Sequence, residues 1–246
     1  MALVFPLAAR EQLVGSAVLL AQHGNHLLFG TALHIIGEFD DIRIAIPPHQ
    51  GNCAQPQTYP VFQAPALAAE VVATNPLADI VILAAEAQTG PNTPLPRIAT
   101  AAGQVSVGSE IIVLGYPFAP VGSFLETWTS GCVVALARRQ VLDGVAVDEL
   151  VLSIQNQPGL AGSAVIGRHD GMVHGILRGP FSPPEVLRVG HIPIANDMSV
   201  VIATSGHYLH DMLRMAKETL ANGQPLVARQ RFESRPSDAP PNFGRR

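Results

Sequence analysis

The sequence has little charge, few aromatic side chains and almost no cysteine, and each shortage argues against a class of protein. Charged residues make up 14% of the 246 residues and aromatic residues 5%, whereas hydrophobic residues make up 48%. This balance favours a large buried core, because disordered chains combine high charge with few apolar residues. The formal net charge of −4 gives no indication of a nucleic-acid-binding surface.

Long hydrophobic runs are also lacking. The longest that we find extends from Ile80 to Ala85, far short of the roughly 18 residues that a membrane-spanning helix requires. The N-terminus has no basic residue ahead of its apolar part, is interrupted by Pro6 and soon reaches Arg10. We therefore expect no signal peptide, and we predict neither membrane nor nucleic acid as a partner.

Cysteine and metal-binding motifs are equally scarce. The two cysteines, Cys53 and Cys132, are far apart in the sequence, and such usage without an export signal is typical of a reducing cytoplasm. We predict a cytoplasmic location with the two thiols unpaired, and a disulfide between them is the alternative. The nine histidines are scattered, with no HExxH or CxxC motif and no phosphate-binding glycine loop before a helix. We expect no metal, nucleotide or other cofactor.

What the sequence does contain is a succession of short runs rich in Val, Ile and Leu, set between Gly, Pro, Asn and Asp. Such runs are typical of strands, and no long segment of helical period interrupts them before residue 200. We therefore predict an all-β protein, either a sandwich or a pair of barrels. The expected strands lie at 15–20, 26–32, 42–46, 71–74, 80–83, 111–114, 131–137, 150–154, 163–166, 172–177 and 191–194.

The pattern changes after residue 204. Apolar residues recur at helical spacing over 205–222, with Ser205 as the expected N-cap and Gly223 just past the end. We predict a C-terminal helix on which His207 and His210 are surface or packing residues rather than ligands. Residues 224–246 are rich in proline and arginine and are predicted to form a flexible tail. A docking tail for a partner is the alternative.

The stretch 158–164, Pro-Gly-Leu-Ala-Gly-Ser-Ala, is the main candidate for a functional loop. Glycines at 159 and 162 allow a tight loop whose N–H groups converge, and converging N–H groups can bind a negative charge that develops on a carbonyl oxygen. The apex of such a loop is the natural place for a nucleophile, but Ala161 has no reactive group. Taken alone, the stretch is equally typical of a glycine-containing hairpin in any β-protein.

Two upstream stretches make a resemblance recognisable. Residues 31–35 (Thr-Ala-Leu-His-Ile) resemble the Thr-Ala-Ala-His motif of the trypsin/chymotrypsin superfamily of serine peptidases, and residues 79–83 (Asp-Ile-Val-Ile-Leu) resemble its Asp-Ile-Ala-Leu-Leu motif. Residues 158–164 resemble the bacterial Pro-Gly-x-Ser-Gly motif, with Ala161 in the place of serine. The order His, Asp, Ser is that of the family.

The resemblance implies two six-stranded β-barrels with the active site in the cleft between them. We place the peptidase domain at 1–223, with the first barrel at about 10–95 and the second at about 104–203. The proline-rich link at 91–96, with the residues directly after it, would connect the barrels. The helix at 205–222 would pack on the second barrel, as it does in the family.

The resemblance also implies roles for the site residues. His34 would be the general base and Asp79 its orienting partner, while Ala161 occupies the nucleophile position. The N–H groups of Gly159 and Ala161 would form the oxyanion hole. The implied function is that of a trypsin-like serine endopeptidase acting on a protein or peptide substrate. This chain is expected to be inactive, and neither Ser163 nor a cysteine is expected to replace the missing serine.

The alanine is open to three interpretations. The first is a peptidase whose nucleophile was substituted deliberately, which the otherwise intact motifs favour. The second is a natural pseudoprotease that binds peptides or acts as a scaffold. The third, an unrelated β-sandwich binding module, is excluded if His34 and Asp79 lie within hydrogen-bonding reach.

Specificity and activation are less clearly encoded. By the resemblance, the substrate pocket would be lined by Gln155, Leu177 and His191. Gln155 at its base predicts no strong preference for Arg or Lys. Leu160 stands where trypsin has the aspartate of its zymogen switch, so we expect no such switch. By analogy with cytoplasmic bacterial relatives, we expect control by loop ordering or by an activating protein partner.

Overall fold

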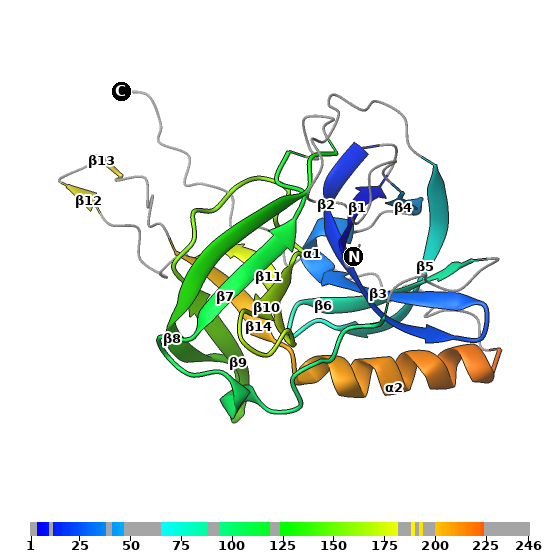
Figure 1. Ribbon diagram of the computed structural model, residues 1–246. Coiled ribbons are helices and arrows are strands. Elements are labelled where there is room, and N and C mark those ends of the chain that lie inside the picture. Colours follow the sequence, from blue (N-terminus) through cyan, green and yellow to red (C-terminus); the bar gives the residue numbers. More distant parts are fainter. Residues whose placement is uncertain are drawn as a thin grey trace, which may run out of the picture.

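The computed structural model describes residues 4–9, 12–37, 41–46, 65–87, 94–118, 124–181, 188–189, 192–193 and 200–223. Within these ranges the chain forms two closed barrels of six antiparallel strands each, with one long helix beside them (Figure 1). This architecture confirms the predicted all-β fold with a C-terminal helix. No helix among the described residues is long and apolar enough to cross a membrane.

The first barrel comprises the strands that precede residue 87. Their hydrogen-bonded order is β1-β2-β3-β6-β5-β4, and β4 pairs with β1 to close the barrel. Inward-facing side chains form one buried cluster, in which the rings of Phe5 and Phe29 meet edge to face at a centroid distance of 5.3 Å. The strands are β1 (Val4–Ala9), β2 (Gln12–His23), β3 (His26–Ala32), β4 (Ile42–Ala45), β5 (Ala66–Asn75) and β6 (Ile80–Glu86).

Strand β1 was not expected, and the first barrel begins at Val4 rather than near residue 10. Proline lacks an N–H group and usually disfavours a strand with two neighbours. Here Pro6 pairs only with Ser16 of β2, because the pairing of β1 with β4 begins at Leu7. The proline therefore lies where only one side of the strand is paired.

The second barrel has the order β10-β11-β14-β9-β8-β7 and is closed by pairing of β7 with β10. Its interior is a second cluster of buried Val, Leu and Ile side chains. Strands β8 and β9 form a long hairpin that turns at Asp143 and Gly144. The strands are β7 (Glu110–Gly115), β8 (Thr127–Leu142), β9 (Val145–Leu152), β10 (Ala164–Gly167), β11 (Val173–Pro180) and β14 (Val201–Ser205).

Helix α2 (Tyr208–Ala221) corrects one expectation, because it lies along the first barrel and not on the second (Figure 1). Its buried residues Leu209, Met212, Leu213 and Ala216 join a cluster that includes Leu28, Val72 and Ala73 of that barrel. The apolar stripe follows the helical period whichever surface it covers, so the period alone could not identify the surface.

The start of α2 also differs from the prediction. Ser205 ends β14, and its Oγ lies 2.9 Å from Nδ1 of His207, which occupies the N-cap position. The Tyr208 hydroxyl accepts a hydrogen bond from the N–H of Asp148 at 2.9 Å. The helix is therefore tied to β9 of the second barrel at its first residue, while its length covers the first barrel.

The remaining elements are short. They are α1 (Leu33–Ile36), the 3-10 turn η1 (Ala102–Gln104), β12 (Arg188–Val189) and β13 (Ile192–Pro193). Between the barrels, Ile98 forms an isolated parallel bridge with Val173, so the connecting segment lies against β11. Cys132 forms no disulfide with any of the described residues. Cys53 and the predicted tail at 224–246 lie outside the described residues, so their predicted states remain predictions.

Candidate active site

His34 is presented at the end of β3, where the strand gives way to the single helical turn α1. The turn is fixed to the β6 side of the barrel, because the N–H of Leu33 donates to the carbonyl of Asp79 at 3.0 Å. Half of the His34 side chain is exposed to solvent. The imidazole is therefore held at its base while its outer edge remains accessible.

Asp79 lies opposite, in the turn immediately before β6. Its backbone adopts φ 56°, an angle uncommon for residues other than glycine. The neighbouring N–H of Ala78 donates to the side chain of Asn75 at 3.1 Å, which stabilises the turn. A strained angle of this kind persists only where the surroundings determine it, and here it directs the carboxylate toward His34.

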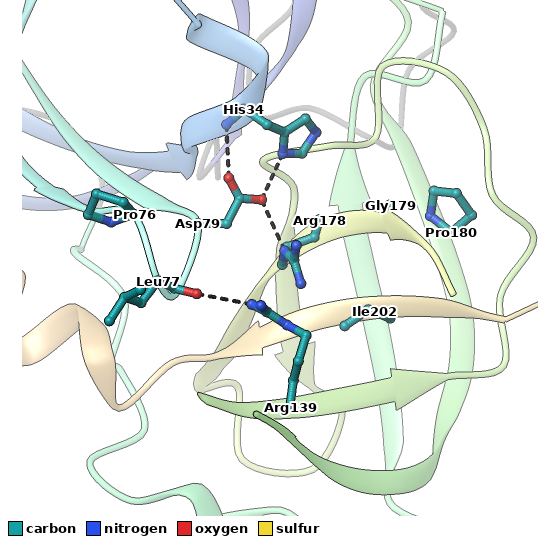
Figure 2. Close-up of a pocket in the computed structure, with 9 residues that line it drawn as sticks. All are labelled: His34, Pro76, Leu77, Asp79, Arg139, Arg178, Gly179, Pro180 and Ile202. Carbon is teal, nitrogen blue, oxygen red and sulfur yellow. Dashed lines mark hydrogen bonds and ion pairs between the residues drawn. The ribbon is translucent and has the colours of Figure 1, made fainter. Parts of the chain in front are cut away.

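The side chains of His34 and Asp79 form a direct hydrogen bond. Oδ2 of Asp79 lies 2.7 Å from Nδ1 of His34, and Oδ1 accepts the backbone N–H of His34 at 2.9 Å (Figure 2). A carboxylate in this position keeps the proton on Nδ1 and leaves Nε2 as an acceptor, which is the form a general base needs. The contact excludes the interpretation as an unrelated module in which these residues are far apart.

Burial alone would raise the pKa of Asp79. The hydrogen bonds and charge of His34, together with a hydrogen bond from Arg178, outweigh that effect and hold the pKa of Asp79 below its ordinary value. Asp79 is therefore an anion at neutral pH.

Arg178 is a site residue that the sequence analysis missed. Its Nε donates to Oδ2 of Asp79 at 3.0 Å, so this oxygen serves both His34 and Arg178 (Figure 2). Its Nη1 donates to Glu149 at 2.7 Å, and Nε of Arg139 donates to the same glutamate oxygen at 2.6 Å. A glutamate inside the apolar run of β9 was the one available signal, because a buried carboxylate requires a partner.

The loop that carries Ala161 belongs to the second barrel but is fixed to the first. Gly159 and Gly162 adopt φ 92° and 85°, the left-handed region that glycine tolerates best. Ser16 of β2 donates from its N–H to the carbonyl of Ala161 at 2.9 Å and from its hydroxyl to the carbonyl of Gly159 at 3.0 Å. The loop conformation is therefore set by contacts from Ser16 to the loop's carbonyl groups, which do not involve the side chain of residue 161.

The loop also meets the helical turn that carries His34. A Cβ built on Gly15 would lie 2.7 Å from both the carbonyl oxygen of Ala161 and the side chain of Ile35, next to His34. Only glycine at 15 allows so close an approach. Among the hydrogen bonds of the described residues, none uses the N–H of Gly159 or of Ala161, so these groups are available as donors at the predicted oxyanion hole.

The other predicted site residues are more dispersed. Ser163 is fully buried, and its Oγ lies against Gly115 of β7, because a Cβ built on Gly115 would collide with it. Gln155 is exposed. The prediction that Leu177 lines a substrate pocket is wrong for its side chain, which is fully buried in the core. His191 lies outside the described residues.

The pocket that the structure describes beside the His–Asp pair has a volume of about 370 Å³. Figure 2 shows the guanidinium groups of Arg139 and Arg178 lying together between the turn before β6 and strand β14. The lining residues are His34, Pro76, Leu77, Asp79, Arg139, Arg178, Gly179, Pro180 and Ile202. In the part of the chain that the structure describes, no group of His, Cys, Asp and Glu is arranged to hold a metal ion.

Sequence comparison settles the family. The sequence model of the Trypsin-like peptidase domain matches residues 15–176, a span from β2 to β11 that includes His34, Asp79 and the Ala161 loop. The chain belongs to the trypsin-like peptidase domain family. No curated protein matches this trypsin-like chain by sequence.

Solved structures share the trypsin-like fold at low sequence identity. The HtrA-type protease AlgW with decapeptide gives a TM-score of 0.58 at 19% identity, covering 86% of this chain and 53% of that one. The inactive form of Rv3671c from M. tuberculosis H37Rv, a Ser-to-Ala mutant, gives a TM-score of 0.58 at 19% identity, covering 91% of this chain and 88% of that one. The serine endoprotease from Yersinia pestis gives a TM-score of 0.59 at 18% identity, covering 88% of this chain and 63% of that one. This trypsin-like chain thus spans little more than half of the AlgW chain.

Proposed function

We propose that this chain is a serine endopeptidase of the His-Asp-Ser type in which the nucleophile position is occupied by Ala161. The observation that carries the proposal is the 2.7 Å contact between Nδ1 of His34 and Oδ2 of Asp79. In such an enzyme, the serine hydroxyl attacks the scissile carbonyl while the histidine accepts its proton and later delivers it to the leaving amine. Both roles use Nε2 of His34, which first accepts the proton and then donates it, and which is free to do so because Asp79 keeps the other ring proton on Nδ1.

Alanine removes the attack and leaves the rest of the arrangement in place. The N–H groups of residues 159 and 161 belong to the backbone, and the loop is fixed through Ser16. Peptide binding should therefore persist. Loss of the nucleophile in a related triad enzyme lowers turnover by about 10⁶-fold, so we expect this chain to bind peptides and hydrolyse almost none.

The deciding experiment is Ala161→Ser, assayed with a fluorophosphonate probe and a peptide library. The serine form should be labelled and should cleave peptides, while the unaltered chain does neither. The double variant Ala161→Ser/His34→Ala is the matched control, because it keeps the hydroxyl but removes the base. If that control is labelled as fast as Ala161→Ser, the proposed role of His34 is wrong.

A natural pseudoprotease that binds peptides is the second candidate, and Arg178 favours it. The guanidinium of Arg178 and the imidazole of His34 share the Oδ2 oxygen of Asp79. A cation at this position weakens the electrostatic stabilisation that the carboxylate gives to a protonated His34. A folded Ala161→Ser chain that stays unlabelled, even with cell lysate from its source, would support this candidate. Labelling only in lysate would indicate an activating protein partner. The cytoplasmic location remains a prediction, and the resemblance of residues 158–164 to a bacterial motif adds the prediction of a bacterial source.

A further inference from the structure

We propose that the pocket beside His34 binds a carboxylate of the bound peptide, held by Arg139 and Arg178. The inference rests on the proposed peptide-binding function and adds a chemical class of ligand to it. It begins from two guanidinium groups that come from different strands, β8 and β11, and line one pocket with His34 (Figure 2).

Both guanidinium groups have donors to spare. A guanidinium carries five N–H groups. Arg139 uses two donor atoms, Nε toward Glu149 and Nη2 toward the carbonyl of Leu77 at 3.0 Å. Arg178 also uses two, Nε toward Asp79 and Nη1 toward Glu149. Among the described residues, no partner is bonded to Nη1 of Arg139 or to Nη2 of Arg178, so each arginine can present further N–H groups to a ligand.

The carboxylates of the cluster lie behind the cations. The side chains of Glu149 and Asp79 are 4% and 12% exposed, whereas those of Arg139 and Arg178 are 36% and 25% exposed. Both oxygens of Asp79 already accept hydrogen bonds from His34. The accessible face of the cluster is therefore made of donors, and it complements an acceptor that carries negative charge.

The geometry of this face is fixed before any ligand arrives. One oxygen of Glu149 accepts from both arginines, at 2.6 and 2.7 Å, and this shared contact holds the two planar groups at a set spacing. A preorganised pair loses little side-chain entropy on binding. Pro76, Pro180 and Ile202 supply apolar walls that suit the aliphatic stem of a glutamate and strengthen the ionic contact by excluding water.

The same chemistry can come from an acidic side chain or from the C-terminal carboxylate of the peptide. The experiment therefore uses the unaltered Ala161 chain, which does not consume its ligand, and fluorescein-labelled decapeptides. One position at a time is fixed as Glu, Gln or Lys, and each set is made with a free and with an amidated C-terminus. Fluorescence anisotropy reports the Kd. We expect Glu, or the free C-terminus, to bind about tenfold tighter than Gln or the amide, since charge-assisted hydrogen bonds are about twice as strong as neutral ones.

Two arginine variants assign the effect. Arg139→Gln should reduce the preference for the carboxylate to about twofold or less while peptides still bind. The matched control is Arg138→Gln, because Arg138 is the adjacent residue but pairs with Asp148 at 2.8 Å and does not line the pocket. If Arg139→Gln does not fold, Arg139→Lys keeps the charge without the planar group and should retain part of the preference.

The outcomes separate the two levels of the proposal. Equal binding of Glu, Gln and amidated peptides by the unaltered chain would overturn the carboxylate pocket and leave the peptide-binding function standing. Equal loss of preference in the Arg138 and Arg139 variants would also overturn it. If none of the peptides binds, the proposed function fails, and the pocket inference fails with it.

Discussion

Arg178 of the second barrel donates its Nε–H to Asp79 of the first barrel across a distance of 3.0 Å. The contact joins the two barrels at the residue that orients His34. Because Asp79 receives hydrogen bonds from both His34 and Arg178, the stability of the fold and the state of the site depend on the same carboxylate.

The first prediction concerns acid stability. The pKa of Asp79 is lower in the folded chain than its ordinary value, despite burial, because of His34 and Arg178. Its contribution to stability is therefore complete above about pH 4, the ordinary range of an aspartate, and is lost as the pH falls through the lower folded value. Asp79→Asn should lower the free energy of unfolding at pH 7 by about 2 kcal/mol and flatten its decline below pH 4.

Urea denaturation between pH 2.5 and pH 7 measures both effects. Part of the acid slope should remain, because the pKa of Asp170 is also lowered: burial raises it, but hydrogen bonds from Met172 and His174 outweigh that effect. Asp143→Asn, in the exposed turn between β8 and β9, is the matched control and should leave the curve unchanged. An Asp79→Asn chain whose acid slope equals that of the unaltered chain would contradict the prediction.

The sequence predicted an all-β fold for a physical reason, because short strands and glycine turns are local features. The pair of barrels and the His34–Asp79 contact were implied instead by the resemblance of three motifs to those of the trypsin/chymotrypsin superfamily. The docking surface of α2 could not be predicted in this way. The apolar face of the helix could pack on either barrel as far as its sequence pattern shows. Only the folded structure shows that it packs against Val72 and Ala73 of the first barrel.

The strand β11 illustrates a finer limit. The resemblance implied Leu177 as a pocket residue, whereas the next residue, Arg178, lines the pocket beside His34. Successive side chains of a strand point to opposite faces, so an error of one residue assigns a core side chain to the site. The register between β11 and β14 also shifts between Leu177 and Gly179, and a bulge of this kind is not visible in a hydrophobic pattern.

The second prediction concerns Ser16, which links the Ala161 loop to the first barrel. Its buried hydroxyl donates to the carbonyl of Gly159 and accepts the N–H of Tyr116, both at 3.0 Å. Ser16→Ala removes both contacts, so we expect a loss of about 2 kcal/mol in the free energy of unfolding. Labelling of Ala161→Ser by the fluorophosphonate probe should also slow, because the loop loses a contact that sets its conformation.

Thermal and urea denaturation test the first effect, and labelling rates test the second. Ser130→Ala is the control, since Ser130 is exposed on β8; its effect should stay within about 0.5 kcal/mol. If Ser16→Ala loses stability but labelling is unchanged, Ser16 supports the fold without positioning the loop.

The third prediction concerns Ser163, the hydroxyl closest in sequence to Ala161, the proposed nucleophile position. Its Oγ is buried and has no hydrogen-bond partner among the described residues, and a Cβ on Gly115 would collide with it. An unpaired buried hydroxyl carries a desolvation cost, so Ser163→Ala should stabilise the chain by about 1 kcal/mol. In the Ala161→Ser background it should leave probe labelling unchanged, because this hydroxyl is fully buried and lies against Gly115 of β7.

Gly115→Ala provides an independent check on the same geometry. The added methyl should destabilise the chain strongly, and Ser163→Ala should recover part of the loss, because the two substitutions meet at one point. Denaturation of the four chains of this double-mutant cycle gives the coupling. Additive effects on stability would show that the two side chains do not contact each other. Loss of labelling in Ala161→Ser/Ser163→Ala would show that Ser163 takes part in the chemistry, contrary to what its burial predicts.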